Sequence, residues 1–396
     1  MKKVLLTNFE IVQYSGSEIN CITIAKRFKE KGYEVYIGAL DFGQPLINEI
    51  DKQNYILINL LEDKFDFIQV EFDILWAQHS FLLDWLIFEK NVKVKRIISS
   101  SLSPKEVFEC MPIYVNDINM IIANSFETKE MLEQEGAKEV SLFENYSFEE
   151  YFKNNKKIKE LKNIAVVSNH IPQEEKEAIN ILKEKGYNVD IYGLEGTRVF
   201  ITDKVLINYD LIITIGKTVQ YAMSLGIPVY IYDIHGGPGY LKLDNIEKNR
   251  SKNFSGRGFN KKDENQIVKE IEEEFNMAIL QREEIKKYAY DNLCFEKIFD
   301  KTLEKLEQTD ELNLEELKEK YRKYHRNILI SKKVTNYIIG RYNKIINYKE
   351  ENIRELKEEN ERLYKIIQSK DEQIMQSSKN NKLYMKIRNR LKRRGK

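Results

Sequence analysis

The fold is decided by the stretch Asp210-Leu-Ile-Ile-Thr-Ile-Gly-Lys-Thr-Val-Gln-Tyr-Ala-Met-Ser-Leu-Gly-Ile-Pro-Val-Tyr-Ile-Tyr-Asp-Ile-His-Gly-Gly-Pro-Gly-Tyr240. Residues 211–215 form the apolar and β-branched run that a parallel strand buried on both faces requires. A helical pattern follows and ends at Gly226, and Pro228 opens a second strand over residues 229–232. In a strand–helix–strand unit both strand ends lie at one edge of a parallel sheet, which is where open α/β sheets bind nucleotides.

The junction Gly216-Lys217-Thr218 is a candidate anion site at the start of this helix. Gly216 lets a ligand approach the backbone, the free N–H groups and dipole of the helix start favour phosphate, and Lys217 adds a full charge. The junction is not a P-loop, because a Walker A motif needs a glycine where this chain has Leu211. The alternative is an ordinary strand–helix turn capped by Thr218. The glycine-rich sequence after the second strand, at the same sheet edge, favours the ligand site.

The composition is that of a globular chain without a strong overall charge. Its 396 residues suggest two or three domains, and 42% hydrophobic residues are enough to build their cores. The formal net charge of +1 gives no global field, so we expect no nucleic-acid partner. Cys21, Cys110 and Cys294 lack metal-ligand spacing, so we expect no bound metal and no disulfide framework. Without a signal peptide or a membrane-spanning apolar run, we expect a cytoplasmic protein.

The strand–helix–strand pattern occurs in two regions, which predicts two α/β domains. In each region the helix ends with the same pentapeptide, Lys-Glu-Lys-Gly-Tyr, at residues 29–33 and 183–187. We place an N-terminal Rossmann-like domain at residues 1–157 and a C-terminal one at residues 158–308. A polar segment within the second domain, residues 245–262, is expected to be a mobile loop.

The last part of the chain, residues 309–396, has a different character, because charged residues dominate and proline is absent. A heptad seam is formed by residues that are predominantly apolar: Ile353, Leu356, Asn360, Leu363, Ile367 and Ile374. The seam predicts a parallel homodimer through residues 350–377, with Asn360 favouring a two-stranded register. The alternative is a single solvated helix.

The chain ends in a strongly basic tail. Residues 379–396 contain nine lysines and arginines and no acidic residue. Such a tail favours peripheral contact with the anionic inner face of a membrane. The alternative is a solubilising tail, or one that adheres to nucleic acid.

Three segments together resemble GT-B glycosyltransferases of a bacterial, family-4-like type. They are Gly16-Ser17-Glu18 after the first strand, Val167-Ser168-Asn169-His170, and the stretch from Asp210 to Tyr240. The resemblance covers roughly residues 1–307 and implies two Rossmann-like domains that face each other across a cleft. It implies transfer of a sugar from a nucleotide-sugar co-substrate, of unidentified base, to a bacterial surface glycan or lipid-linked acceptor.

The resemblance also implies roles for particular residues. In these enzymes a helix terminus and cations, without metal or further cofactor, neutralise the leaving diphosphate. The residues expected to bind the donor and its diphosphate are Gly16, Ser17, Ser168, Asn169, His170, Gly216, Lys217 and Thr218. The loop expected at the donor sugar contains Asp233, His235, Gly236, Gly237 and Gly239. Glu18 and His79 are the candidate catalytic residues.

Several of these expectations have plainer alternatives. His79 and His170 stand at strand ends, where hydrogen-bonded structural histidines are common, and Glu18 can stabilise its own helix dipole. The family often carries a Glu-x7-Glu pair whose second carboxylate holds the ribose, but this chain has Tyr221 at that position. Ribose recognition must therefore differ or be lost. Two alternatives to the transferase stay open: a GT-B-like scaffold organised by its coiled coil, and a nucleotide-sugar epimerase.

Overall fold

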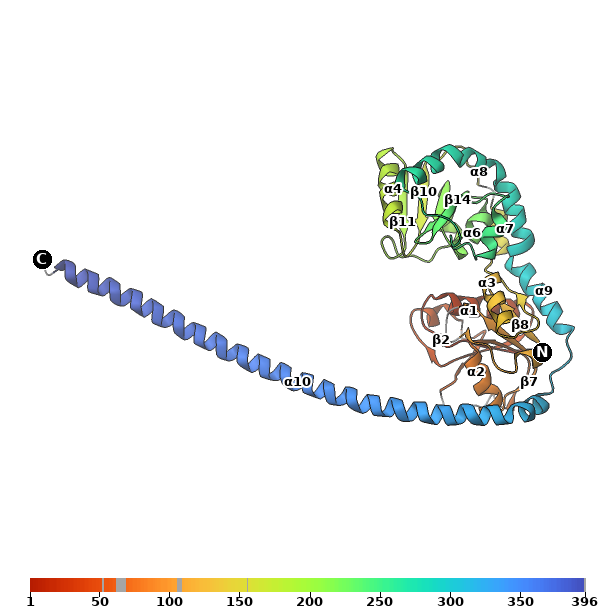
Figure 1. The fold of residues 1–396 in the computed structure, drawn as a ribbon, viewed down its shortest axis with the longest axis horizontal. Helices are drawn as coiled ribbons and strands as arrows, with labels where there is room; N and C mark the ends of the chain where they lie inside the picture. The colour runs from red at the N-terminus through yellow and green to blue at the C-terminus, as the bar shows by residue number, and fades with distance from the viewer. Residues whose placement is uncertain (52, 62–68, 105–108, 155, 395–396) are drawn as a thin grey trace. The chain divides into compact units, whose positions relative to one another are not determined.

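The computed structural model describes residues 1–51, 53–61, 69–104, 109–154 and 156–394, with side chains 327–336, 338, 371, 375, 378, 388 and 391–394 left out. The chain divides into two compact units, Met1–Lys320 and Tyr321–Lys396. The first unit contains two α/β domains, and the second is helical (Figure 1). The predicted fold class, two Rossmann-like domains followed by a helical extension, is confirmed.

The first domain is built on a seven-stranded sheet in which every neighbouring pair is parallel. Its strands are β1 (Lys3–Thr7), β3 (Glu34–Ala39), β5 (Ile56–Asn59), β6 (Glu71–Gln78), β7 (Lys93–Ser101), β8 (Met120–Ala123) and β9 (Ser141–Leu142). The order β5-β3-β1-β6-β7-β8-β9 reverses direction between β1 and β6. A small separate pair is formed by β2 (Glu10–Ile11) and β4 (Asp41–Phe42).

Short and medium helices connect these strands. They are α1 (Gly16–Glu30), η1 (Leu46–Glu49), α2 (Ser80–Asp84), the π-helical turn η3 (Trp85–Glu89), η5 (Val115–Asp117), α3 (Phe126–Gln134) and η6 (Glu149–Lys153). Residues 4–6 of β1 and 35–37 of β3 are fully or almost fully buried. This double burial explains why their sequences are continuous apolar runs instead of alternating ones.

The second domain has a five-stranded sheet of order β11-β10-β12-β13-β14. Its strands are β10 (Asn163–Val167), β11 (Asn188–Tyr192), β12 (Leu211–Thr214), β13 (Val229–Asp233) and β14 (Gly236–Tyr240). The first four are parallel, and β14 returns antiparallel to β13 as a hairpin. The connecting helices are α4 (Gln173–Glu184), α5 (Asp203–Leu206), α6 (Lys217–Leu225), α7 (Ile246–Ser251) and α8 (Glu264–Leu293). The strand–helix–strand unit expected over residues 211–232 is therefore present.

Helix α9 (Phe295–Glu307) follows the second sheet in sequence but packs in the core of the first domain. Phe299 is fully buried and stacks on Trp76, with ring centroids 6.1 Å apart and planes 6° from parallel. The core it joins includes Leu6 and Phe28. The first domain is thus completed by a helix from the end of the region expected to be the second domain.

The segment 245–262 is not the open loop that its polar composition suggested. It contains α7, and Phe254 is 1% exposed. The carbonyl of Phe254 accepts a hydrogen bond from the N–H of Gly216, and Arg250 forms a bidentate ion pair with Glu144. Both groups of that pair are largely buried, so the segment is held by interactions that its sequence does not reveal.

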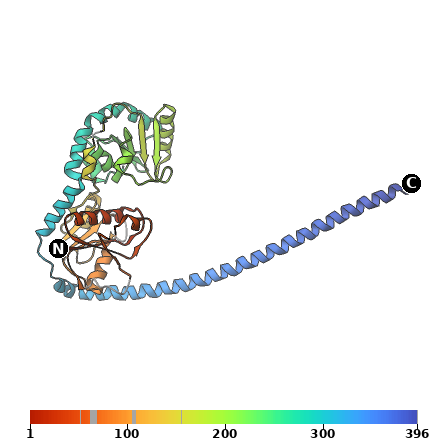
Figure 2. The same ribbon diagram turned by 180° about the vertical axis from the view of Figure 1, so that it is seen from behind.

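Helix α10 runs from Leu314 to Arg394 as one continuous helix of 81 residues (Figures 1 and 2). Its first residues belong to the first compact unit, where Leu317 is 3% exposed and Lys320 pairs with Asp117. That unit ends at Lys320, beyond the boundary expected at residue 309. Within the described ranges, no helix combines the length and apolar character needed to span a bilayer.

Candidate functional site

A pocket of about 430 Å³ lies at the carboxyl edge of the second sheet. It is called the switch-point pocket below, because β11 and β12 lie on opposite sides of β10 and the strand order reverses there. Its walls come from the ends of four parallel strands and from the start of α6. The lining residues are Val167, Ser168, Asn169, His170, Tyr192, Gly193, Val199, Ile201, Thr214, Ile215, Thr218 and Asp233.

The start of α6 gives this pocket backbone donors. Gly216 is the N-cap with φ +62° and ψ −137°, a conformation that a side chain would strain. The first turn closes with the bond from the N–H of Val219 to the carbonyl of Gly216, at 3.0 Å. Within the described chain, the N–H groups of Lys217 and Thr218 have no backbone acceptor, and Thr218 lines the pocket. This arrangement suits an anion.

The loop after β10 forms the facing wall. The hydroxyl of Ser168 accepts a hydrogen bond from the N–H of His170 at 3.0 Å, which folds the loop over the strand end. A Cβ at Gly193 would lie 2.1 Å from the carbonyl oxygen of Ser168, so only glycine fits beside this loop. His170 is exposed at the rim. The loop therefore presents hydroxyl, amide and imidazole groups to a ligand.

Lys217 does not line the switch-point pocket. Its Nζ lies 4.6 Å from the ring centroid of Tyr146 and 5.7 Å from that of Tyr221. In the part of the chain that the structure describes, no carboxylate forms an ion pair with it, and burial lowers its pKa to about 8. Tyr221, in the position of the expected glutamate, is 6% exposed and contacts Phe148 and Tyr151.

The glycine-rich sequence after β13 forms a β-hairpin instead of a loop. Asp233 ends β13 and lines the switch-point pocket, whereas His235 is exposed in the turn. The three glycines lie in β14 and meet protein atoms. Cβ atoms at Gly236, Gly237 and Gly239 would lie 2.5 Å from Asn260 O, 1.9 Å from Ile231 O and 2.6 Å from Glu270 Oε2. The close backbone approach expected for a ligand is made here by the protein itself.

In the first domain, Glu18 holds the loop before α1. Its Oε2 accepts hydrogen bonds from the N–H groups of Val12 and Gln13, at 2.5 and 2.7 Å, and the residue is 3% exposed. Gly16 and Ser17 begin α1 beside this loop, and a Cβ at Gly16 would meet nothing within 4 Å. The carboxylate thus shapes the glycine-containing loop, while open space adjoins Gly16.

His79 stands at the end of β6 in a strained backbone conformation, with φ +67°. Its Nδ1 accepts a hydrogen bond from the N–H of Phe9, and its Nε2 lies 3.8 Å from Oε1 of Glu109. Burial lowers the pKa of His79 to about 4, so the imidazole is neutral near pH 7. Because the N–H of Phe9 donates to Nδ1, only Nε2 of the imidazole faces other partners.

The structure brings together five of the predicted residues: Ser168, Asn169, His170, Thr218 and Asp233. Sequence reasoning missed Tyr192, Gly193, Thr214 and the pair Val199 and Ile201. The first three follow from the rule that strand ends line such a pocket, once β11 and β12 are assigned. The pair in the irregular segment before α5 has no sequence signal. No group of three His, Cys, Asp or Glu side chains within the described ranges is arranged to hold a metal ion.

No protein-family model and no curated protein matches this chain. Among solved structures, it is similar to a glycosyltransferase from Rickettsia africae, with a TM-score of 0.55 and 16% identity, covering 78% of this chain and 98% of that one. It is also similar to WaaG, a glycosyltransferase involved in lipopolysaccharide biosynthesis, with a TM-score of 0.46 and 10% identity, covering 77% and 100%. A third similar structure is the glycotransferase of kitacinnamycin, with a TM-score of 0.46 and 10% identity, covering 76% of this chain and 98% of that one. The first comparison agrees with the two sheets: the chain has the GT-B glycosyltransferase fold.

The partly buried amine of Lys217 predicts a pH dependence of stability. The folded pKa of about 8 is below the ordinary 10.5, so between these values the unfolded chain binds more protons. The free energy of unfolding should therefore rise with pH across this window. Below pH 8 the amine is charged in both states, so the full cost of holding that charge in the folded chain is present. Lys217→Met should be more stable at pH 7 and lack the rise. Thermal unfolding at pH 7 and pH 9.5 measures both effects.

Lys176→Met is the matched control, because the side chain of Lys176 is 40% exposed and pairs with Glu195 at 2.7 Å. This control should keep the pH dependence of the unmodified chain. Identical pH profiles for the unmodified chain and Lys217→Met would show that the amine is not buried.

Proposed function

We propose that this protein is a glycosyltransferase that transfers a sugar from a nucleotide-sugar donor. The observation that carries the proposal is the switch-point pocket, where the free N–H groups of α6 meet the loop after β10. The GT-B fold, which the chain shares with a glycosyltransferase at a TM-score of 0.55, supports this assignment. Both features suit a ligand that carries a diphosphate.

The proposed chemistry uses electrostatic stabilisation of the leaving group. As the sugar is transferred, negative charge develops on the nucleoside diphosphate, and preorganised N–H donors at a helix start stabilise that charge. The N–H and hydroxyl of Thr218 and the hydroxyl of Ser168 are the donors we assign to the phosphates. Lys217 lies within the same turn, and an anion at the helix start would favour its charged form. We propose that this happens without a divalent metal.

We further propose that the acceptor is a bacterial surface glycan or its lipid-linked precursor. The first domain would bind it near His79, whereas Gly16, Ser17 and Glu18 would approach the sugar and phosphates of the donor. The proposed place of action is the cytoplasmic face of the membrane, where such precursors are assembled.

The positions of Tyr221 and Lys217 favour a second candidate, a scaffold that retains the fold without transfer. Tyr221 packs against Phe148 and Tyr151, so no carboxylate stands where the family resemblance places a ribose ligand. Lys217 is held over aromatic rings. Nucleotide binding separates the two functions, because a scaffold has no need of it.

Binding of nucleoside diphosphates tests the proposal. Isothermal titration of the full chain in EDTA with UDP, ADP, GDP, CDP and dTDP should reveal binding of at least one. Thr218→Val should weaken that binding about tenfold or more, because a hydrogen bond to a charged group contributes roughly 1.5–3 kcal/mol. Thr302→Val is the control, since its hydroxyl bonds to Ile298 O in α9 and does not line the pocket. A folded chain that binds none of the five supports the scaffold instead.

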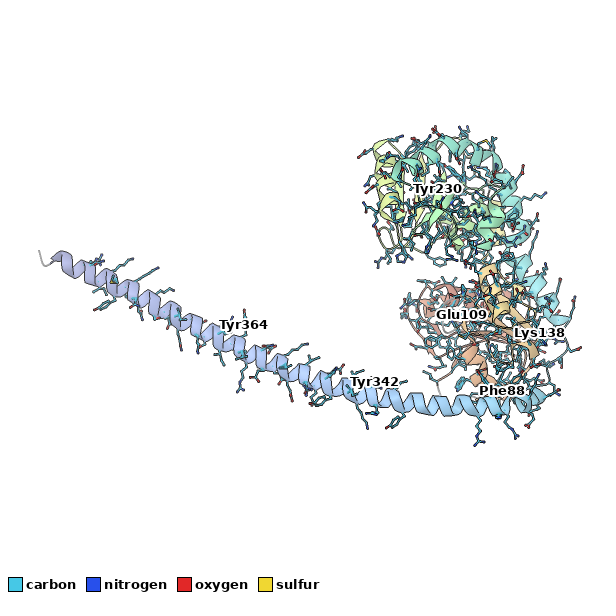
Figure 3. The ribbon with its side chains drawn as sticks, viewed as in Figure 1. Phe88, Glu109, Lys138, Tyr230, Tyr342 and Tyr364 are labelled. Atoms are coloured by element: carbon cyan, nitrogen blue, oxygen red, sulfur yellow. The ribbon has the colours of Figure 1, made fainter. Side chains whose placement is uncertain are left out.

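The proposed homodimer is based on two rows of mostly apolar, exposed side chains along α10. The first row contains Ile339, Ile346, Ile353, Asn360, Ile367 and Ile374, and its isoleucines are 49–64% exposed. A second row, displaced by three residues, includes Tyr342, Leu356 and Leu363, which are 62, 64 and 48% exposed. Tyr342 projects from α10 in Figure 3. The rows extend upstream of the expected region 350–377, and pairing with a second copy would bury both.

Disrupting these rows should abolish the dimer. We expect light scattering to give a dimeric mass for the full chain and a monomeric mass for the double variant Leu356→Glu and Leu363→Glu, because charges would enter the apolar seam. Tyr348→Glu is the control, since Tyr348 is 67% exposed but lies outside both rows. A monomeric unmodified chain, or a dimeric double variant, argues against pairing through α10.

The basic tail is proposed to hold the dimer at an anionic membrane. Each basic residue near such a surface contributes about 1 kcal/mol, and parallel pairing would double the number at one end. The full chain should sediment with vesicles containing phosphatidylserine, less so at high salt, and a chain ending at Ser378 should remain in solution. Equal sedimentation of the two chains would remove the tail from membrane contact, and competition by RNA would indicate a tail that adheres to nucleic acid.

A further inference from the structure

The wall of the switch-point pocket at the end of β13 is acidic. Among the described residues that line the pocket there is no lysine or arginine, and Asp233 is the only carboxylate. Asp233 is 4% exposed, and its Oδ1 accepts a hydrogen bond from the N–H of Ile234. No described residue donates a hydrogen bond to its Oδ2. That oxygen is therefore available to a ligand in the pocket.

A second buried carboxyl group, Glu175, interacts electrostatically with Asp233. Glu175 is 1% exposed, and neither of its oxygens has a hydrogen-bond partner. It is the third residue of α4, from which a glutamate normally bonds back to the N-cap N–H, but the N-cap is Pro172, which has none. Burial, with the charge of Asp233 as the next cause, raises the pKa of Glu175 to about 8. Near pH 7 Glu175 is therefore neutral.

Lys176 follows Glu175 in sequence, Lys261 follows Asn260, whose carbonyl approaches Gly236, and both lysines are engaged by other acidic residues. Lys176 pairs with Glu195 at 2.7 Å, and Lys261 lies 3.8 Å from Glu174. No cation in the described ranges forms an ion pair with Asp233 or Glu175. A ligand atom at this end consequently meets negative charge that the protein does not compensate. Hydroxyl and amino groups can donate to it, whereas a carboxylate would be repelled.

We propose that Asp233 is a specificity-determining residue that selects donors whose sugar carries hydroxyl or amino groups and rejects donors whose sugar carries a carboxylate. The inference rests on the proposed function, because it takes the switch-point pocket as the donor site. A sugar hydroxyl donates to the free Oδ2 of Asp233. A uronic acid places its own carboxylate in the same pocket, where no lysine or arginine among the described lining residues can pair with it.

Matched pairs of sugar nucleotides test this selection. Isothermal titration of the full chain at pH 7 in EDTA compares UDP-glucose with UDP-glucuronate and GDP-mannose with GDP-mannuronate, pairs that differ only at the sugar C6. We expect the neutral member to bind about tenfold more tightly or better, the effect of one well-placed interaction with a charged group. Asp233→Asn should reduce the difference to about threefold or less, because the repelling charge is removed.

Two controls separate a local effect from a general change of charge. Glu195→Gln removes a charge outside the pocket, and Glu175→Gln replaces a side chain that is neutral at pH 7 by another neutral one. Both should keep the full preference. Equal affinities within each pair for the unmodified chain overturn the inference, even if Asp233→Asn does not fold. A preference that persists in folded Asp233→Asn overturns it too. Binding of UDP or GDP without discrimination leaves the proposed function intact, whereas absence of any nucleotide binding overturns both.

Discussion

Burial of β12 on both faces is the constraint from which the geometry of the site follows. All residues from Leu211 to Thr214 are buried, and the strand pairs in parallel with β10 on one side and β13 on the other. The hydroxyl of Thr214 donates to the carbonyl of Val167 at 2.8 Å and so ties the ends of β12 and β10 together. Because these ends are fixed, the loop after β10 and the first turn of α6 must face each other across the switch-point pocket.

Several glycines of the second domain lie where two backbone segments approach each other closely. The N–H of Gly216 bonds to the carbonyl of Phe254, so the N-cap of α6 is held by the segment that follows the hairpin. A Cβ at Gly256 would lie 2.4 Å from the carbonyl of Gly236, which shows how closely that segment crosses β14. A glycine-rich sequence in this domain can therefore mark a close approach of two chain segments or open space for a ligand. The two cases differ only in which atoms occupy the space beside the glycine.

The charges around the site come from different elements of the second domain. The positive elements, the start of α6 and the partly buried amine of Lys217, follow the end of β12. The acidic elements, Asp233 and Glu175, lie at the end of β13 and the start of α4. No ion pair between described residues joins the positive and acidic groups. Each group can therefore interact with a ligand separately. This polarity agrees with a ligand that has an anionic part and a part rich in hydroxyl groups.

Local sequence patterns were enough to predict the two α/β domains, the helical extension and five residues of the switch-point pocket. Buried parallel strands need continuous apolar runs, and strand ends in a doubly wound sheet gather at one edge. Three features could be seen only in the folded chain: α9 completes the first core, Lys217 lies over Tyr146 and Tyr221, and the three glycines of β14 meet protein atoms. Those outcomes depend on which distant residues become neighbours, and neither hydrophobic period nor turn chemistry encodes the identity of a neighbour far away in the chain.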